Sequence, residues 1–384
     1  MKITALIGFF ALAMGAVDSG AAERFRPAAP EYVVLRVPAR TVNDPISVLE
    51  QQHVLAPADQ RIATELAGLY LERARQQREA RYFGRAETLL QPWVMRADAS
   101  TATLRVQADI LQNRHDFSGA LRLLDTAVER DPRDAGVRLM RASVRMVQGR
   151  FGDARSDCAA VLASGESAAG TICLAQVLGG TGRLAQGESL LKTVLARDDV
   201  LPVTVRGWAL WLQADFADRR GNDRAAEGLL REALRAEPSN EGIRSALSDL
   251  LVARGAKREA LAVLDLPAPS TGLLVRRAHI QKLLGDAAID ATRAQIEDLL
   301  SLARRRGEPP HLREEALLAL DVDGDAQRAL QLAKKNFATQ RETIDVRLLA
   351  RAARAAGDRD AIAAVIRWVH DTGFEDEILA GIRT

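Results

Sequence analysis

The sequence predicts an all-α protein in which antiparallel helix pairs stack into one curved solenoid. The chain is rich in Ala, Leu, Arg and Glu, which are good helix formers because they lose little side-chain freedom in a helix. Aromatic residues make up only 4% of a chain that is 47% hydrophobic, so small and aliphatic side chains must build the core. Small residues and turn glycines also recur about every 34 positions, and a period of this length indicates a repeat architecture.

The N-terminal region precedes the repeats and reads as an export signal. In residues 1–22, Lys2 is followed by an apolar stretch at 3–17 and then by small residues up to Ala22. This order is typical of a secretory signal peptide, so we expect cleavage near Ala22 and a periplasmic or secreted product. An uncleaved anchor is the alternative, because the basic region is a single Lys. Residues 23–44 contain prolines and polar residues and predict an extended leader.

One complete repeat unit occupies residues 101–132. Its two helices have apolar faces formed by Leu104, Ala108 and Leu111, and by Ala120, Leu124 and Ala127. The small residue that opens the second helix recurs at Ala86, Ala120, Ala154, Gly187, Ala226 and Ala260. The turn glycines recur at Gly149, Gly182, Gly221, Gly255, Gly285, Gly324 and Gly357. A small residue in each helix lets the two helix axes approach closely.

This unit resembles the tetratricopeptide repeat, in which small and large residues alternate at the same places. The resemblance implies a right-handed superhelical solenoid over residues 45–384, with about eight repeats and a capping helix near 46–55. Each helix pair leaves one apolar face uncovered, so neighbouring pairs must stack into a single continuous core. After Gly285 the spacing loosens, and Pro309-Pro310 interrupts the pattern.

Two polar features of the middle repeats look structural. Arg141 stands where the tetratricopeptide pattern usually has Leu, and the resemblance implies an ion pair with Asp157 inside the repeat. Cys158 and Cys173 fall on neighbouring helices of consecutive repeats. For an exported protein a disulfide between them is our leading interpretation. Two buried free thiols are the alternative.

The sequence shows no pattern typical of a catalytic centre, a metal site or a cofactor site. The five histidines are His53, His115, His279, His311 and His370, and no two of them share one helix face. A Ser-x-x-Lys match at 189–192 lacks its companion elements, and the acidic loop at 321–325 lacks the spacing of a calcium site. The glycines at 179–182 lack the Lys of a phosphate-binding loop. A net charge of +2 does not favour binding to nucleic acid. We therefore expect no enzyme activity, no cofactor and no membrane-spanning segment after signal cleavage.

The resemblance also indicates where a partner would bind, because first helices line the concave surface in this family. Its usual ligand-contacting positions correspond here to Trp208, Trp211, Asp215 and Asp218 in one helix, to Arg105, Asp109, Gln112, Asp249, His279 and Lys282 in neighbouring ones, and to a basic stripe of Arg347, Arg351 and Arg354. Trp208 and Trp211 share a face and would be good anchors, because rings give large contact area at little entropy cost. Alternatively, both rings cover an irregular joint after the insert at 198–205, and the basic stripe is a solvated face.

The sequence therefore predicts a non-catalytic scaffold of the cell envelope that binds a peptide or helix of another envelope protein in its groove. A second hypothesis is a component of envelope polysaccharide export or assembly that contacts glycan directly, with the two Trp rings as stacking platforms.

Overall fold

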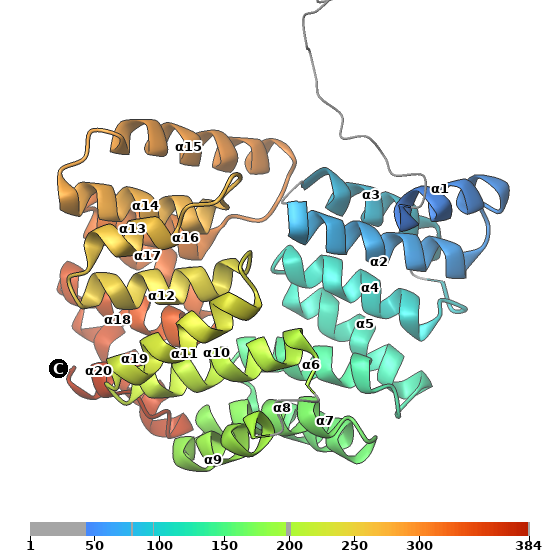
Figure 1. Cartoon of the computed structure of the whole chain (residues 1–384), viewed down its shortest axis with the longest axis horizontal. Helices are drawn as coiled ribbons and strands as arrows, with labels where there is room; N and C mark the ends of the chain where they lie inside the picture. Colours follow the sequence, from blue (N-terminus) through green and yellow to red (C-terminus); the bar gives the residue numbers. More distant parts are fainter. Residues whose placement is uncertain (1–43, 78–79, 95, 197–200, 383–384) are drawn as a thin grey trace, which may run out of the picture.

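The computed structural model describes residues 44–77, 80–94, 96–196 and 201–382, and the regular elements in these residues are all helical (Figure 1). The expected signal peptide, and the expected leader except for Asp44, lie outside this range. None of the helices in the described part combines the length and apolar character that crossing a membrane requires.

A leading helix, α1 (Pro45–Leu55), is followed by nine helix pairs in the described residues, one more than the sequence suggested. The first five pairs are α2 (Gln60–Gln77) with α3 (Ala80–Leu90), α4 (Thr101–Asn113) with α5 (Phe117–Arg130), α6 (Ala135–Val147) with α7 (Phe151–Ala163), α8 (Ser167–Gly179) with α9 (Leu184–Leu195), and α10 (Val203–Arg219) with α11 (Asp223–Ala236). The next pairs are α12 (Glu241–Ala253) with α13 (Lys257–Val263), α14 (Thr271–Leu284) with α15 (Ile289–Arg305), α16 (Leu312–Leu317) and its π-helical continuation η3 (Leu318–Asp323) with α17 (Ala326–Phe337), and α18 (Thr343–Ala356) with α19 (Arg359–Thr372). A short helix η1 (Gln91–Trp93) follows α3, and α20 (Glu377–Ala380) comes last.

The helix boundaries follow from capping residues in the sequence. Ser100, Asp116 and Asp134 each accept a hydrogen bond from the backbone N–H three residues further on, which satisfies a donor that has no partner inside the helix. All seven turn glycines of the periodic pattern adopt positive φ, as expected. In the α4–α5 turn, where the pattern has no glycine, His115 adopts φ 57° in its place.

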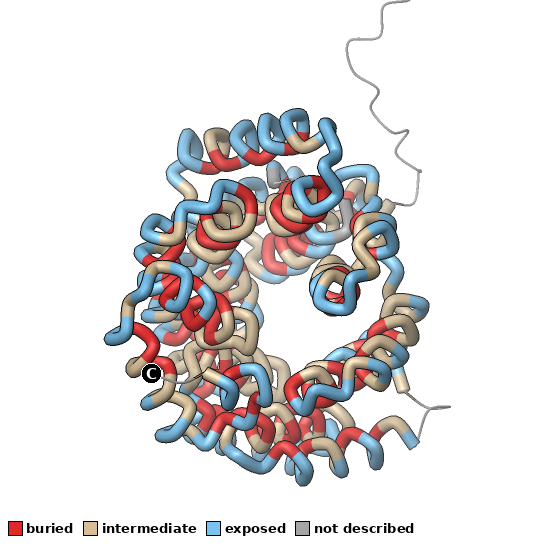
Figure 2. The backbone as a smooth tube through the Cα atoms, turned by 90° about the vertical axis from the view of Figure 1, so that its left-hand side faces the viewer, coloured by how far each residue is buried: buried red, intermediate tan, exposed pale blue. Residues whose placement is uncertain are grey.

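The recurring small residues lie where the two helices of a pair come closest. Ala86, Ala120 and Ala154 have no exposed surface. At Gly187 an added Cβ would lie 2.7 Å from the carbonyl oxygen of Ala175 and 2.8 Å from the Phe216 ring, so even alanine would not fit. Buried apolar side chains form a succession of clusters along the stack, and the buried faces turn toward neighbouring helices (Figure 2). This confirms the predicted all-α solenoid of stacked pairs.

The stacking loosens at the junction that the sequence marked as irregular. Unlike the second helices before it, α15 makes little contact with the first helix that follows it, α16, and packs mainly on α14. On α15 only the narrow stripe of Thr292, Ile296, Leu300 and Ala303 is buried.

The C-terminal pairs curve back onto the turns of the earlier pairs (Figure 1). The backbone N–H of Arg341, between α17 and α18, donates to the carbonyl oxygen of Val147 at the end of α6, 2.7 Å away. The N–H of Leu184 donates to Glu375 Oε1 at 2.9 Å. The superhelix is therefore closed on itself by contacts between residues nearly 200 positions apart in the chain.

We call the residues that make this closure, Phe374, Glu375 and Asp376 with Arg219 and Arg347, the C-terminal clasp. Arg219 is only 3% exposed and donates to the carbonyl oxygens of Glu375 (2.9 Å) and Gly179 (2.6 Å). Its guanidinium carbon lies 3.8 Å from the centre of the Phe374 ring. Arg347 bridges Asp218 (2.5 Å) and Asp376 (2.8 Å). The clasp thus joins α8, α10, α18 and the residues after α19.

Candidate partner-binding surface

A pocket of about 220 Å³ lies between α10 and the start of α12. Among its lining residues are Gly207, Trp208, Trp211, Glu237, Asn240 and Ile243. In the described residues, α10 and α12 come less close to each other than the other consecutive first helices do. The pocket is therefore a gap in the row of first helices, at the place where both predicted Trp anchors lie.

The two Trp side chains have different surroundings. Trp208 is half-buried and packs against two apolar clusters that involve α6, α7, α8, α9 and α10. Trp211, one turn later on the same face, is 37% exposed. Trp208 thus packs against the core and also lines the pocket, whereas Trp211 is more exposed to solvent.

A fixed carboxylate and amide lie beside the rings. The Asn240 side chain donates to Glu237 Oε2 (3.2 Å), and its oxygen accepts from the backbone N–H of Ile243 (3.2 Å). Gly207 permits this arrangement, because an added Cβ there would collide with the Glu237 carboxylate. The pocket therefore offers apolar rings together with one oriented acceptor for a charged or N–H donor.

The acidic residues of the α10 stripe are occupied within the chain. Asp215 pairs with Arg219 (3.5 Å), and Asp218 pairs with Arg347, so two predicted stripes meet each other in the clasp. Burial raises the pKa of Asp218, and the nearby Arg347 opposes this effect.

The stripe on α4 is partly engaged as well. Asp109 accepts hydrogen bonds from both terminal nitrogens of Arg75 on α2, at 3.1–3.2 Å. Arg105 is exposed beside Gly136, and Gln112 is half-buried. These residues lie apart from the Trp pocket, whose lining comes from α10 to α12.

The remaining predicted residues form two further groups. Asp249 holds the nearly buried Arg276 through bonds of 2.8–3.0 Å, and Lys282 Nζ donates to the carbonyl oxygen of Val322 at 2.7 Å. Arg351 pairs with Asp321, whereas Arg354 is exposed. Burial lowers the pKa of His279, against the opposing charge of Asp321.

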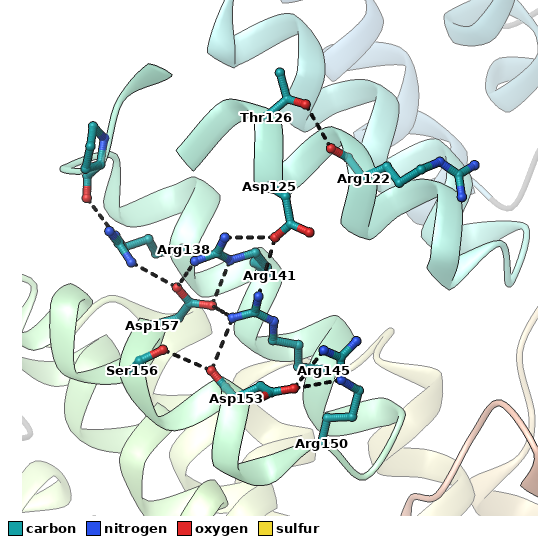
Figure 3. A network of polar contacts seen from close by, with 11 residues as sticks. Arg122, Asp125, Thr126, Arg138, Arg141, Arg145, Arg150, Asp153, Ser156 and Asp157 are labelled. Atoms are coloured by element: carbon teal, nitrogen blue, oxygen red, sulfur yellow. Dashed lines mark hydrogen bonds and ion pairs between the residues drawn. The ribbon is translucent and has the colours of Figure 1, made fainter. Parts of the chain in front are cut away.

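The predicted ion pair of the third repeat is present and belongs to a larger cluster (Figure 3). Asp157 is fully buried and accepts from Arg138 (3.0 Å), Arg141 (2.6 and 2.9 Å) and Arg145 (2.8 Å). Half-exposed Asp125 of the preceding repeat also contacts Arg141 and Arg145. The cluster thus replaces part of the apolar contact between neighbouring repeats with charge pairs.

Cys158 and Cys173 form a disulfide, with their Cα atoms 5.3 Å apart. It links α7 to α8, the second helix of one pair to the first helix of the next. The alternative of two free thiols is therefore not what the structure contains.

Sequence reasoning missed the clasp. An arginine at position 219 is not part of the recurring pattern, Asp376 lies after the last helix pair, and a contact between segments this far apart leaves no local pattern. A weak signal was the run Phe374-Glu375-Asp376, an apolar residue and acids outside the helical period.

No family model matches the sequence, and no curated protein matches it. Several solved structures resemble parts of the chain at low sequence identity. A thermophilic tetratricopeptide repeat protein from Thermus thermophilus is 21% identical, with a TM-score of 0.39 over 52% of this chain and 99% of its own. A tetratricopeptide repeat protein from Parabacteroides merdae is 15% identical, with a TM-score of 0.40 over 74% of this chain and 98% of its own. Human IFIT1, a dimer with m7Gppp-AAAA, is 14% identical, with a TM-score of 0.48 over 87% of this chain and 84% of its own.

The described chain is an all-α protein of helices packed in consecutive antiparallel pairs, an architecture consistent with a tetratricopeptide-type solenoid. In this repeat protein the described residues contain no group of three or more His, Cys, Asp or Glu placed to hold a metal ion. The pocket's rings and single carboxylate are suited to holding a side chain of a partner.

Proposed function

We propose that this repeat protein is a non-catalytic scaffold of the cell envelope that holds a peptide or helix of another envelope protein along its first helices. The observation that carries the proposal is the pocket at Trp208 and Trp211. Binding energy in protein interfaces concentrates in a few pockets with aromatic anchors, and the exposed Trp211 is such an anchor.

The pocket also indicates the chemistry of the segment that enters it. An apolar side chain would cover the Trp211 ring, and a neighbouring Lys, Arg or backbone N–H would donate to Glu237. Because Asn240 already holds Glu237 in place, little side-chain freedom is lost on binding.

The envelope location is supported by the signal-like sequence of residues 1–22 and by the disulfide. Disulfides persist in oxidising compartments and are rare in the cytosol.

Tryptophan fluorescence with a purified pool of envelope-protein peptides tests this function. We expect peptide binding to change the emission, and Trp211→Ala to weaken binding about tenfold or more, since anchor residues contribute about 2 kcal/mol or more. Val54→Ala is the matched control, because Val54 is 78% exposed on α1, far along the chain from the pocket. Equal binding by wild type and Trp211→Ala would contradict the proposal.

The same titration with envelope polysaccharide tests the second candidate. The exposed Trp211 ring is also suited to stacking on a sugar. A response to polysaccharide that is lost in Trp211→Ala, without a response to peptides, would favour direct glycan contact.

A further inference from the structure

A second, larger hollow lies on another face of the stack. It has a volume of about 940 Å³ and runs between the second helices α9 and α11, over α10, with the residues after α19 at one end. It shares no lining residue with the Trp pocket, so it is a separate surface.

Small residues form the floor of this cleft. Ala217 of α10 and Ala225 and Gly228 of α11 line it. A Cβ added at Gly228 would meet no atom within 4 Å, so no contact inside the described chain requires glycine there. Glycine inside a helix costs about 0.5–1 kcal/mol relative to alanine. The small side chains leave the cleft open, and small residues allow another helix axis to come near.

The rim of the cleft carries an excess of negative charge. Glu188, Glu232, Glu375 and Glu377 line it, against two cations, Lys192 and Arg220. Both cations already lie 3.6 Å from Glu188, and Glu232 pairs with Arg206 from outside the lining. Glu375 and Glu377 have no ion pair with any described residue, so their charge is available to a partner.

The clasp holds one of these free carboxylates in position. Glu375 accepts from the backbone N–H of Leu184 at 2.9 Å, and its own carbonyl oxygen accepts from the buried Arg219. Glu377 follows one residue after Asp376, which caps the start of α20 through the N–H of Leu379. A carboxylate that is already oriented loses less entropy on binding than a free one.

We propose that this cleft docks a short helix of a partner protein, one that carries Lys or Arg toward Glu375 and Glu377 and small residues toward Gly228. A groove between two helices with a small-residue floor suits an amphipathic helix better than an extended strand. The scaffold thereby has two docking surfaces, the Trp pocket and this acidic cleft.

Fluorescence anisotropy with a labelled, alanine-rich helical peptide bearing lysines tests the proposal, with the same peptide bearing glutamates as its counterpart. We expect the full-length protein to bind the lysine peptide and not the glutamate peptide. Raising the salt concentration should weaken binding, because exposed charges are screened.

Two variants test separately how the small-residue floor and the free carboxylates contribute to peptide binding. Gly228→Leu fills the floor and should weaken binding tenfold or more. The variant should not destabilise α11, because leucine has a higher helix propensity than glycine. Gly84→Leu is the matched control, because Gly84 is also an exposed helical glycine with open space around it, on α3. Glu375→Gln combined with Glu377→Gln should weaken binding similarly, while the glutamine oxygen still accepts from Leu184.

The outcome distinguishes this surface from the Trp pocket. Trp211→Ala should leave lysine-peptide binding unchanged. A docking surface should bind the lysine peptide with a Kd below about 1 mM. Absence of binding by the wild-type protein up to that concentration would overturn the proposal. Equal binding by wild type and Gly228→Leu would overturn it as well.

Discussion

Asp157 is the centre of a charge cluster between the two helices of one repeat, α6 and α7. It has no exposed surface, yet it carries a charge that three arginines of α6 neutralise. A buried ion pair adds little net stability over an apolar contact, but removing one partner leaves buried charges without compensation. The cluster therefore makes stability sensitive to a single carboxylate.

We expect Asp157→Ala to lower the free energy of unfolding by about 3–5 kcal/mol, as measured by chemical denaturation. Asp125→Ala is the matched control and should cost less, since Asp125 is half-exposed and only supplements Asp157. An unchanged denaturation midpoint for Asp157→Ala would remove the cluster from the account of stability.

His279 is expected to make the fold sensitive to acid. Burial lowers its pKa below the ordinary value of about 6.5, so the unfolded chain binds a proton more readily than the folded one. Its contribution to stability is therefore present above pH 6.5 or so and is lost as the pH falls through that value.

Melting temperatures measured between about pH 7.5 and 5.5 test this sign. His279→Gln should reduce the loss of stability in acid. His370→Gln, which removes an exposed histidine of α19, is the comparison. A loss in acid that is the same in wild type and in His279→Gln would show that other groups cause it.

At the residue scale, the sequence predicted contacts within one repeat better than contacts between distant repeats. Arg141 was identifiable because it replaces an expected Leu, and Asp157 lies close by in sequence. Arg138 and Arg145 join the same carboxylate only because helical spacing places all three arginines on one face. The role of Arg219 in the clasp could not be assigned, because Phe374 and Glu375 follow more than 150 positions later.

At the scale of helices, local chemistry fixes most of the architecture. The turn glycines and the small residues of the second helices occupy the predicted places, because backbone conformation and close packing restrict what each site accepts. The α15–α16 junction is different. Its proline pair indicated an interruption, but how α15 lies against its neighbours depends on tertiary packing.

The disulfide between α7 and α8 is the one covalent link between helices in the described residues. Its cysteines are 15 positions apart, and closing a loop of that size removes unfolded-state entropy worth about 3 kcal/mol. We expect Cys158→Ala with Cys173→Ala to lower the free energy of unfolding by about this amount in denaturant titrations.

Mass spectrometry supplies the direct check on this bond. Protein purified without reductant should show no alkylatable thiol. Two alkylated cysteines under those conditions would mean that the bond does not form in the cell.

At the scale of the whole molecule, the clasp turns a row of helix pairs into a closed superhelix. Together with the bond from Arg341 to Val147, its bonds join the C-terminal segments to the third, fourth and fifth pairs. A solenoid held only by nearest neighbours would lack such contacts. The composition and period predicted the stack, but they carry no information on whether its C-terminal pairs contact its middle pairs.

Arg219→Ala should loosen this closure, because it removes two hydrogen bonds to carbonyl oxygens and the contact with Phe374. Hydrogen exchange at Leu184 and Arg341, whose N–H groups bond across the closure, should become faster. Arg220→Ala, a change at the exposed neighbour, should leave both amides as protected as in wild type. Unaltered protection in Arg219→Ala would show that the clasp does not hold the C-terminal residues against the middle pairs.

The most direct test of the scaffold account is photo-crosslinking in intact cells from a reactive residue placed at Trp211. Arg155, exposed on α7, provides the control position. We predict that position 211 captures one protein, through one segment of its chain, and that position 155 does not. Capture of no protein from position 211, or of the same mixture from both positions, would contradict the account.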